Sequence, residues 1–235
     1  MRLKDPILFI PGVIAPYQLG NWHYFNNLNK FMQSKYYIAE IDSWGTLAER
    51  SLELKSYIDE HITENKIHIL THSKGGLDLE YLFQTYPEYR DRVLSHTSLS
   101  CPYGGSIIAF IFWILFFPLE LSTRGKKVRA TLRELFPKKR TKEIKQNYPE
   151  YCILGYLGIF TPTYPLFFIT NIFILLSEGA NDGFVSVKSS QKGEVLKKYK
   201  TDHIGLIGHF YTRKRQDIFE NILKTLALKI NENEK

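Results

Sequence analysis

The stretch 67–82 constrains the fold of this chain more than any other, because it predicts a strand, a tight turn and a helix in direct succession. It reads IHILTHSKGGLDLEYL: an apolar run comes first, and Leu77 and Tyr81 later share one helical face. Ser73 lies at the tip between the two elements. We expect the turn to hold Ser73 in a strained backbone conformation, with its hydroxyl clear of the sheet. The glycines that follow let the helix pass close beneath the strand.

Composition sets limits on the class of protein. A chain of 235 residues, 44% hydrophobic and 23% charged, suits one globular domain or a domain with an insertion. Two cysteines, Cys101 and Cys152, exclude a disulfide-rich scaffold, and either one bridge or two buried thiols remain open. The first six residues lack the apolar core of a secretory signal, so we expect a cytoplasmic or peripheral membrane protein unless a signal precedes this sequence.

Apolar runs and helical spacing predict the elements around this central stretch. Strands are expected at 6–10, 36–42, 93–100 and 195–199, and amphipathic helices at 46–62 and 216–230. Strands that alternate with helices in this way indicate the α/β class, with a mostly parallel sheet flanked by helices.

The middle of the chain has a different character. Residues 107–117 are eleven consecutive apolar residues, and residues 152–177 carry no charge. Between them, the segment 122–147 holds ten Lys or Arg and two acids, a net charge of +8 in a chain of +7. The first apolar run is shorter than the roughly 20 residues that span a bilayer, and Pro162 and Pro165 interrupt the second. A single spanning helix is therefore not expected.

Two interpretations of these apolar runs stay open. In the first they are core: a buried cap helix and a central strand around 166–173. In the second they form a cap whose apolar face is exposed at a membrane or lipid surface, beside cations that suit anionic headgroups. Either way, we expect residues 103–163 to be a cap inserted into a single domain, 1–235. A nucleic-acid partner is not expected, because nothing near the basic segment resembles a nucleic-acid-binding module.

A serine hydroxyl needs a base to remove its proton during attack, normally a histidine oriented by a carboxylate. After Ser73, Asp182 lies in a loop dense in turn residues and His203 lies in a later loop. His209 is an alternative base, and Glu178 and Asp202 are alternative acids. His72 is adjacent to Ser73 in sequence and so cannot easily turn its ring onto it.

Four blocks resemble those of bacterial triacylglycerol lipases of the α/β-hydrolase fold, and the resemblance covers most of the chain outside 107–163. They correspond to the family patterns H-G-hydrophobic, G-H-S-x-G-G-L-x-x-x-Y, G-T-P-H-x-G-S, and N-D-G-x-V-x-x-x-S-S with D-H-L. In this chain they lie at 8–13, 71–81, 100–106, and 181–190 with 202–203. Pro11 replaces the His of the first pattern, and Thr71 replaces the first Gly of the second.

The resemblance implies an α/β-hydrolase fold and a serine hydrolase of carboxylic esters, a lipase or esterase. Ser73 would be the nucleophile, Asp182 the orienting acid and His203 the general base, with the backbone N–H groups of Val13 and Lys74 as the oxyanion hole. The expected substrate is a lipid-like acyl ester, cleaved through an acyl-Ser73 intermediate. A thioesterase or acyltransferase with the same residues, or a non-catalytic membrane-docked protein, are the alternatives.

One departure from the family concerns metal. These lipases hold calcium partly through an acid two residues after the catalytic His, where this chain has Gly205. We therefore expect no structural calcium, and no Cys/His set has the spacing of a metal site. No cofactor is expected. The cap matches no known pattern, so the resemblance does not predict the acyl chain or head group.

Overall fold

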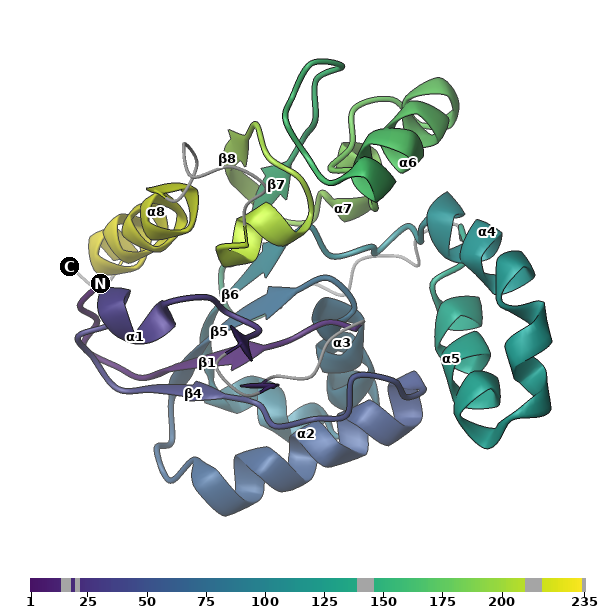
Figure 1. Ribbon diagram of the computed structural model, residues 1–235. Helices are drawn as coiled ribbons and strands as arrows, with labels where there is room; N and C mark the ends of the chain where they lie inside the picture. The colour runs from purple at the N-terminus through teal and green to yellow at the C-terminus, as the bar shows by residue number, and fades with distance from the viewer. Residues whose placement is uncertain (14–17, 20–21, 139–145, 210–216, 234–235) are drawn as a thin grey trace.

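The computed structural model of the chain describes residues 1–13, 18–19, 22–138, 146–209 and 217–233. Its centre is a six-stranded sheet with the order β4-β1-β5-β6-β7-β8, in which every neighbouring pair is parallel (Figure 1). The strands are β1 (Ile7–Ile10), β4 (Tyr36–Ile38), β5 (Ile67–His72), β6 (Val93–Leu99), β7 (Glu150–Gly155) and β8 (Glu194–Tyr199). A small antiparallel pair, β2 (Gln18–Leu19) and β3 (Trp22–His23), lies outside this sheet.

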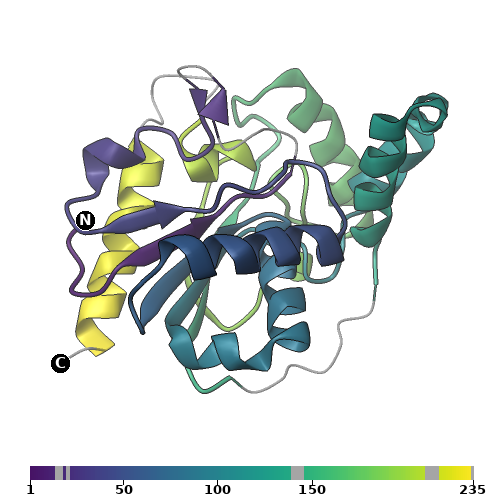
Figure 2. The same cartoon turned by 90° about the horizontal axis from the view of Figure 1, so that it is seen from below.

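Helices cover both faces of the sheet, as Figures 1 and 2 show from two directions. The helices α2 and α3 lie on one face, and α1 and α8 on the other. The α-helices are α1 (Leu28–Phe31), α2 (Leu47–His61), α3 (Gly75–Thr85), α4 (Ile107–Leu115), α5 (Thr123–Glu134), α6 (Pro165–Ser177), α7 (Val187–Ser190) and α8 (Asp217–Asn233). Short 3-10 helices are η1 (Pro87–Arg92), η2 (Phe117–Leu121) and η3 (Ile204–Ile207).

The strand β1 shows why the sheet is covered on both sides. Its four residues are all apolar and all buried. Successive side chains of a strand point to opposite faces. Ile7 and Phe9 accordingly pack in the cluster that contains α8, whereas Leu8 and Ile10 pack in the cluster that contains α2 and α3. A continuous apolar run is the pattern of a parallel strand buried on both faces.

The predicted fold class is confirmed, and most predicted elements lie within a few residues of their expected bounds. The helix expected at 46–62 is α2, which begins with a capping box formed by Thr46 and Glu49. The strand expected at 36–42 ends at Ile38. Four of the ten cations counted at 122–147 lie outside the described residues.

Two predictions for the middle of the chain need correction. The strand expected around 166–173 is wrong: these residues lie in helix α6, which begins with Pro165 in its first turn, where proline fits a helix well. The expected cap, 103–163, contains β7, which pairs with β6 and β8 inside the main sheet. The helices that stand outside the sheet in this region are α4, η2 and α5, and we call them the inserted helices (Figure 1).

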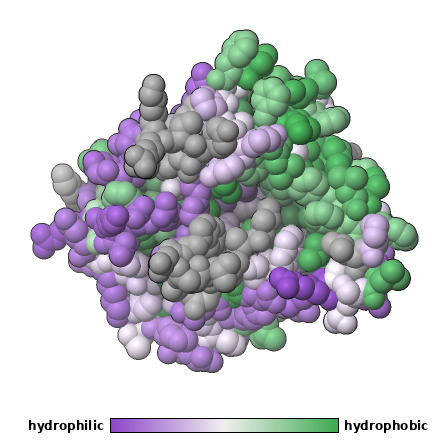
Figure 3. All heavy atoms as spheres, viewed as in Figure 1, coloured by the Kyte–Doolittle hydropathy of each residue, from purple (hydrophilic) through white to green (hydrophobic). Residues whose placement is uncertain are grey.

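The helices of the two apolar runs expose many large side chains, whereas the strand β7 at the start of the second run is buried. Leu121, Phe160 and Leu176 are 96%, 95% and 83% exposed, and many neighbours on α4 and α6 are also accessible. Figure 3 shows this apolar surface as a continuous region over α4 and α6. We call it the apolar face; its exposed residues are Phe110, Ile114, Leu115, Phe117, Leu121, Ile159, Phe160, Leu166, Phe168, Ile169, Ile172, Phe173, Leu175 and Leu176. No helix in the described part of the chain combines the length and apolarity needed to cross a bilayer.

Helix α8 offers a matched test of the core. The Phe219 side chain is fully buried against Phe25 and Phe31, whereas Leu228 on the same helix is 67% exposed. We expect Phe219→Ala to lower the free energy of unfolding by about 3–5 kcal/mol through lost burial and a cavity. Leu228→Ala should change it by less than about 0.5 kcal/mol. Urea unfolding of the three proteins measures both values, and equal losses would contradict the described packing of α8.

Candidate active site

The turn at Ser73 is the sharpest feature at the carboxyl end of the sheet. Ser73 follows β5 directly and has a φ of 55°, in the left-handed region that residues other than glycine rarely adopt. Two glycines let other segments approach this turn. A Cβ atom on Gly12 would lie 2.6 Å from the Cβ of Ser73, and one on Gly75 would lie 2.7 Å from the carbonyl oxygen of Ile10. The strained turn predicted from the sequence is therefore present, with the close helix–strand approach.

Three residues that are far apart in the sequence meet at this turn. The Nε2 atom of His203 is 2.9 Å from the Oγ of Ser73, and its Nδ1 atom is 2.7 Å from Oδ2 of Asp182. All three side chains are buried. The His203 ring also contacts the rings of His72 and Phe184, with centroid distances of 4.6 Å and 5.2 Å. The arrangement is a serine, a base and an acid joined by one chain of hydrogen bonds.

A tight turn after Asn181 fixes the Asp182 carboxylate. Its Oδ1 atom accepts hydrogen bonds from the backbone amides of Phe184 and Val185, at 3.0 Å and 2.8 Å. Gly183 has a φ of +89° in this turn, and its amide donates to the side chain of Asn181. The backbone amide of His203 in turn donates to the carbonyl oxygen of Asp182 at 2.9 Å. Acid and base are thus held together by their main chains as well as by their side chains.

The alternative bases and acids have other partners. The Nε2 atom of His209 donates to the carbonyl oxygens of His23 and Tyr24. Asp202 accepts hydrogen bonds from the Thr163 hydroxyl and the Gly205 amide, and burial raises the pKa of its carboxyl. Glu178 lies at the C-terminal end of α6. The structure therefore brings Ser73, Asp182 and His203 together and leaves these three candidates out of that chain.

The two expected oxyanion donors are each next in sequence to a residue of the serine turn or of the loop that packs on it. Val13 follows Gly12 in the loop that packs on the serine, and Lys74 is the next residue of the turn. Among the described residues, no hydrogen-bond acceptor is recorded for the backbone amide of either. The amide of Gly12, in contrast, donates to the hydroxyl of Tyr24 at 2.8 Å. The two amides expected as oxyanion donors are therefore not bonded to an acceptor within the described residues.

Thr71, the departure from the family pattern, has its own structural role. Its buried hydroxyl is 2.9 Å from Nε2 of His96 on the neighbouring strand and 3.3 Å from the Sγ of Cys101. Both cysteines are buried, and burial raises the pKa of the Cys101 thiol to about 12. A threonine is accommodated here because β6 supplies a polar partner for it.

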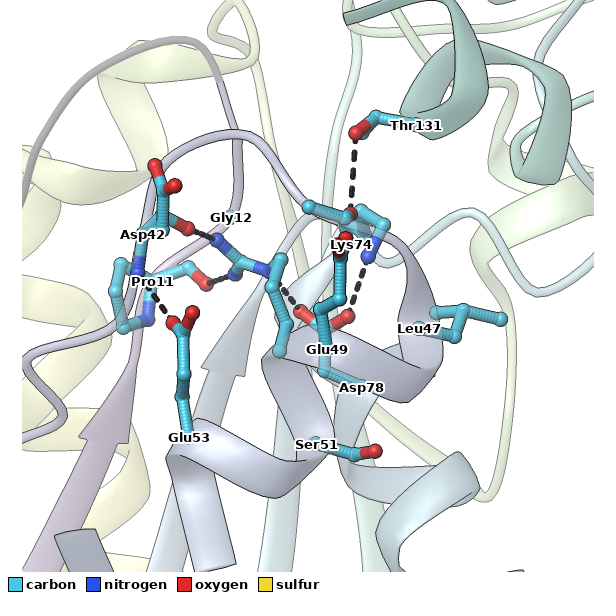
Figure 4. A network of polar contacts seen from close by, with 12 residues as sticks. Pro11, Gly12, Asp42, Leu47, Glu49, Ser51, Glu53, Lys74, Asp78 and Thr131 are labelled. Atoms are coloured by element: carbon cyan, nitrogen blue, oxygen red, sulfur yellow. Dashed lines mark hydrogen bonds and ion pairs between the residues drawn. The ribbon is translucent and has the colours of Figure 1, made fainter. Parts of the chain in front are cut away.

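Sequence reasoning missed a cluster of buried charges directly beneath the serine turn (Figure 4). Asp78 binds Lys74 and Arg50 through its two carboxylate oxygens, at 2.5 Å and 2.8 Å, and all three side chains are fully buried. Arg50 also donates to the carbonyl oxygens of Pro11 and Asp42. Burial lowers the pKa of Lys74, and the negative charge of Asp78 opposes that shift. The spacing of Lys74 and Asp78, one helical turn, was the only signal for this cluster in the sequence.

Helix α5 of the inserted helices reaches the same cluster. Glu134 Oε2 lies 3.8 Å from the ammonium of Lys74, and burial raises the pKa of this carboxyl. Three side chains at helical spacing on α5 contact the loop before α2 and the first residue of α2. These contacts are Lys127 with Asp42 at 2.5 Å, Thr131 with the carbonyl of Gly45 at 3.1 Å, and Glu134 with the amide of Leu47 at 2.8 Å. The inserted helices are thereby tied by polar contacts to the turn that carries the serine.

In the described part of the chain, no three His, Cys, Asp or Glu side chains are grouped so that they could hold a metal ion. The absence of structural calcium was predicted from Gly205, whose amide donates to Oδ1 of Asp202. That expectation stays a prediction.

Comparisons with known proteins give a consistent result. No family model matches the chain. The chain is 27% identical to triacylglycerol lipase 2 of Saccharomyces cerevisiae over 225 residues, which cover 87% of this chain and 68% of that protein. The metagenomic carboxyl esterase MGS0156 superposes with a TM-score of 0.77 at 16% identity, covering 97% of this chain and 76% of that one. The Bacillus licheniformis lipase BlEst2 in mature form gives a TM-score of 0.67 at 16% identity, covering 95% and 92%.

The buried position of Asp78 leads to a prediction about stability. Asp78→Asn removes the only full negative charge in contact with both Lys74 and Arg50 among the described residues. Arg50 then has no carboxylate partner there, and Lys74 has only Glu134, at 3.8 Å. We expect a loss of about 3–5 kcal/mol in the free energy of unfolding, measured by urea denaturation. Asp59→Asn is the matched control, because Asp59 pairs with Lys55 at the same spacing on an exposed surface. It should cost a small fraction of that loss. Similar effects of the two variants would contradict the role of Asp78.

Proposed function

We propose that this α/β-hydrolase, which resembles triacylglycerol lipases, is a serine hydrolase that cleaves lipid-like carboxylic esters. The observation that carries the proposal is the hydrogen-bonded chain from Ser73 through His203 to Asp182 at a strained strand–helix turn. The three residues follow the order serine, acid, histidine that is typical of this fold. The likeness to a triacylglycerol lipase and to esterase structures supports the same reaction class.

In the proposed reaction, the Oγ atom of Ser73 attacks the ester carbonyl while Nε2 of His203 takes the hydroxyl proton. Asp182 holds the ring through Nδ1 and stabilises the imidazolium that forms. The imidazolium then gives its proton to the leaving alcohol, and the acyl group stays on Ser73. Water, deprotonated by His203, attacks the acyl-enzyme in the second half and releases the acid.

The proposed oxyanion hole consists of the backbone amides of Val13 and Lys74. Such donors act on the negative charge that develops on the carbonyl oxygen in the transition state. The packing of Gly12, the residue before Val13, on Ser73 and the place of Lys74 directly after Ser73 support this role. The Lys74 side chain is bound to Asp78 instead, so only its backbone is assigned to the reaction.

We further infer that the apolar face contacts the surface of an anionic lipid membrane. The exposed residues on α4, η2 and α6 form a contiguous apolar region, larger than scattered surface residues would give (Figure 3). Exposed cations on the adjacent helix α5, Arg124, Lys126 and Arg133, favour negatively charged headgroups over neutral ones. Helix α4 also reaches the site, because Phe112 contacts Phe184, whose ring lies on His203. A lipid surface at this face would lie beside the reacting groups.

The hydrolase proposal predicts a specific covalent adduct. A fluorophosphonate probe should label Ser73 stoichiometrically, because His203 assists the attack of the serine oxygen on phosphorus and fluoride leaves. Ser73→Ala and His203→Ala should abolish labelling and lower kcat for a p-nitrophenyl ester by about 10⁴-fold to 10⁶-fold. Mass spectrometry locates the adduct, and His209→Ala serves as the control that should still label. An unlabelled wild-type protein that is folded, tested with and without lipid vesicles, would rule out the proposal. A series of esters and matching thioesters then identifies the preferred substrate.

The membrane proposal predicts salt-dependent binding to vesicles. The protein should sediment with vesicles that contain phosphatidylserine, and binding should weaken as sodium chloride rises because screening reduces the attraction of the cations. Leu121→Asp with Phe160→Asp should abolish binding, since charge is costly in an apolar contact. Leu228→Asp is the matched control, because Leu228 is exposed on α8, which lies on the opposite side of the molecule from α4. Equal binding of all variants would contradict the assignment of the apolar face.

A further inference from the structure

A second chain of hydrogen bonds lies beside the proposed catalytic residues and has no part in the reaction as described so far. The amide of Gly12 is 2.8 Å from the hydroxyl oxygen of Tyr24, and this oxygen is 2.7 Å from Nδ1 of His72. The other ring nitrogen of His72, Nε2, is 3.1 Å from the carbonyl oxygen of His203. The side chains of Tyr24 and His72 are both buried. These three hydrogen bonds thus join four separate segments, those of Gly12, Tyr24, His72 and His203.

The direction of this chain is fixed by its two ends. A backbone carbonyl can only accept a hydrogen bond, so Nε2 of His72 must carry the proton that is donated to His203. A neutral imidazole has one such proton, so Nδ1 is an acceptor and the hydroxyl of Tyr24 donates to it. The same hydroxyl then accepts from the amide of Gly12, which can only donate. Burial lowers the pKa of His72 well below its usual range, in agreement with a neutral ring.

Three of the four segments joined by these hydrogen bonds carry a group of the proposed reaction, and Tyr24 connects them. Gly12 precedes Val13 and packs against Ser73, so its position sets where the Val13 amide lies. His72 immediately precedes Ser73, and the carbonyl bound by its ring belongs to the proposed base, His203. A change in any of the three contacts would shift the oxyanion donor, the nucleophile or the base relative to the others.

We propose that Tyr24 and His72 are positioning residues for ester hydrolysis, which hold the Val13 amide, Ser73 and His203 at fixed separations. This inference rests on the proposed function. It predicts an effect on kcat rather than on KM, because correctly placed oxyanion donors act mainly on the transition state. As expected from its place next to Ser73 in the sequence, the ring of His72 is not hydrogen-bonded to the serine but to Tyr24 and to the carbonyl of His203. His72 acts on the site through its neighbours.

Tyr24→Phe is the most selective test, because it removes one oxygen atom and keeps a ring that packs against Phe25 and His72. It deprives the Gly12 amide of its acceptor and Nδ1 of His72 of its donor. We expect kcat for a p-nitrophenyl ester to fall about tenfold to hundredfold, with KM within about twofold of wild type. The rate of fluorophosphonate labelling at Ser73 should fall in proportion to kcat.

Tyr103→Phe is the matched control. Tyr103 is also buried near the serine turn, and its hydroxyl has no hydrogen-bond partner among the described residues. We expect this variant to keep the kcat and the labelling rate of wild type. The inference is overturned if Tyr24→Phe is folded and retains kcat within about twofold, or if both variants lose kcat equally.

Two further measurements keep the test decisive. His72→Gln keeps a donor that can reach the His203 carbonyl but loses the ring acceptor for Tyr24, so it should show the same fall in kcat even if Tyr24→Phe does not fold. In wild type, ¹⁵N NMR of labelled histidines should show His72 as the neutral Nε2–H tautomer between pH 6 and 8. A protonated ring or the Nδ1–H tautomer would overturn the inference even in a protein without measurable activity. A wild-type protein that shows the expected tautomer but forms no fluorophosphonate adduct would instead refute the proposed function and leave the hydrogen-bond chain in place.

Discussion

The structure of the site depends on one steric constraint, the left-handed turn at Ser73. A serine with a φ of 55° is unfavourable by itself, and it persists only because the surrounding segments leave no alternative. Gly12 and Gly75 bring the loop after β1 and the start of α3 within contact distance of this turn, closer than any side chain would permit. The serine oxygen, the proposed oxyanion donors and the end of β5 are therefore parts of one packed unit.

Buried polar groups stabilise that unit from two sides. Beneath the turn, Asp78 joins Lys74 to Arg50, and Arg50 binds the carbonyl of Pro11 in the loop that leads to Gly12 (Figure 4). Beside it, the ring of His72 connects the same loop, through Tyr24, to the segment of His203. Breaking one member of such a network leaves buried donors or charges unpaired, which costs more than the bond itself contributes. Both networks converge on the loop at 11–13.

The inserted helices combine two surfaces with different physical properties. On one side, α5 is held by polar contacts to the loop before α2 and, through Glu134, approaches the ammonium of Lys74. On the other side, α4 and α6 expose the apolar face to solvent, although Ile108 and Ile174 pack together beneath it. Apolar surface of this size is normally buried in a protein core, but no other described element covers it. The proposed lipid surface would cover the apolar face. Its contact would exclude water from the apolar side chains and leave the polar contacts of α5 intact.

The sequence by itself determined the parallel sheet and the strained turn at Ser73, and its resemblance to bacterial lipases pointed to Asp182 and His203 as the partners of that serine. The sheet and the turn depend on local patterns: an apolar run buried on both faces and small residues at a tight turn. Asp182 instead follows helix α6, where a strand was expected. Only the tertiary structure decided that α6 is a helix and β7 a central strand, because an uncharged apolar run satisfies either element and its surroundings make the choice. It also decided the partners of His72, Tyr24, Arg50 and Asp78. Hydrogen bonds and ion pairs between residues 28 to 131 positions apart leave no periodic signal in the chain, and they arise only when the sheet brings its loops together at one edge.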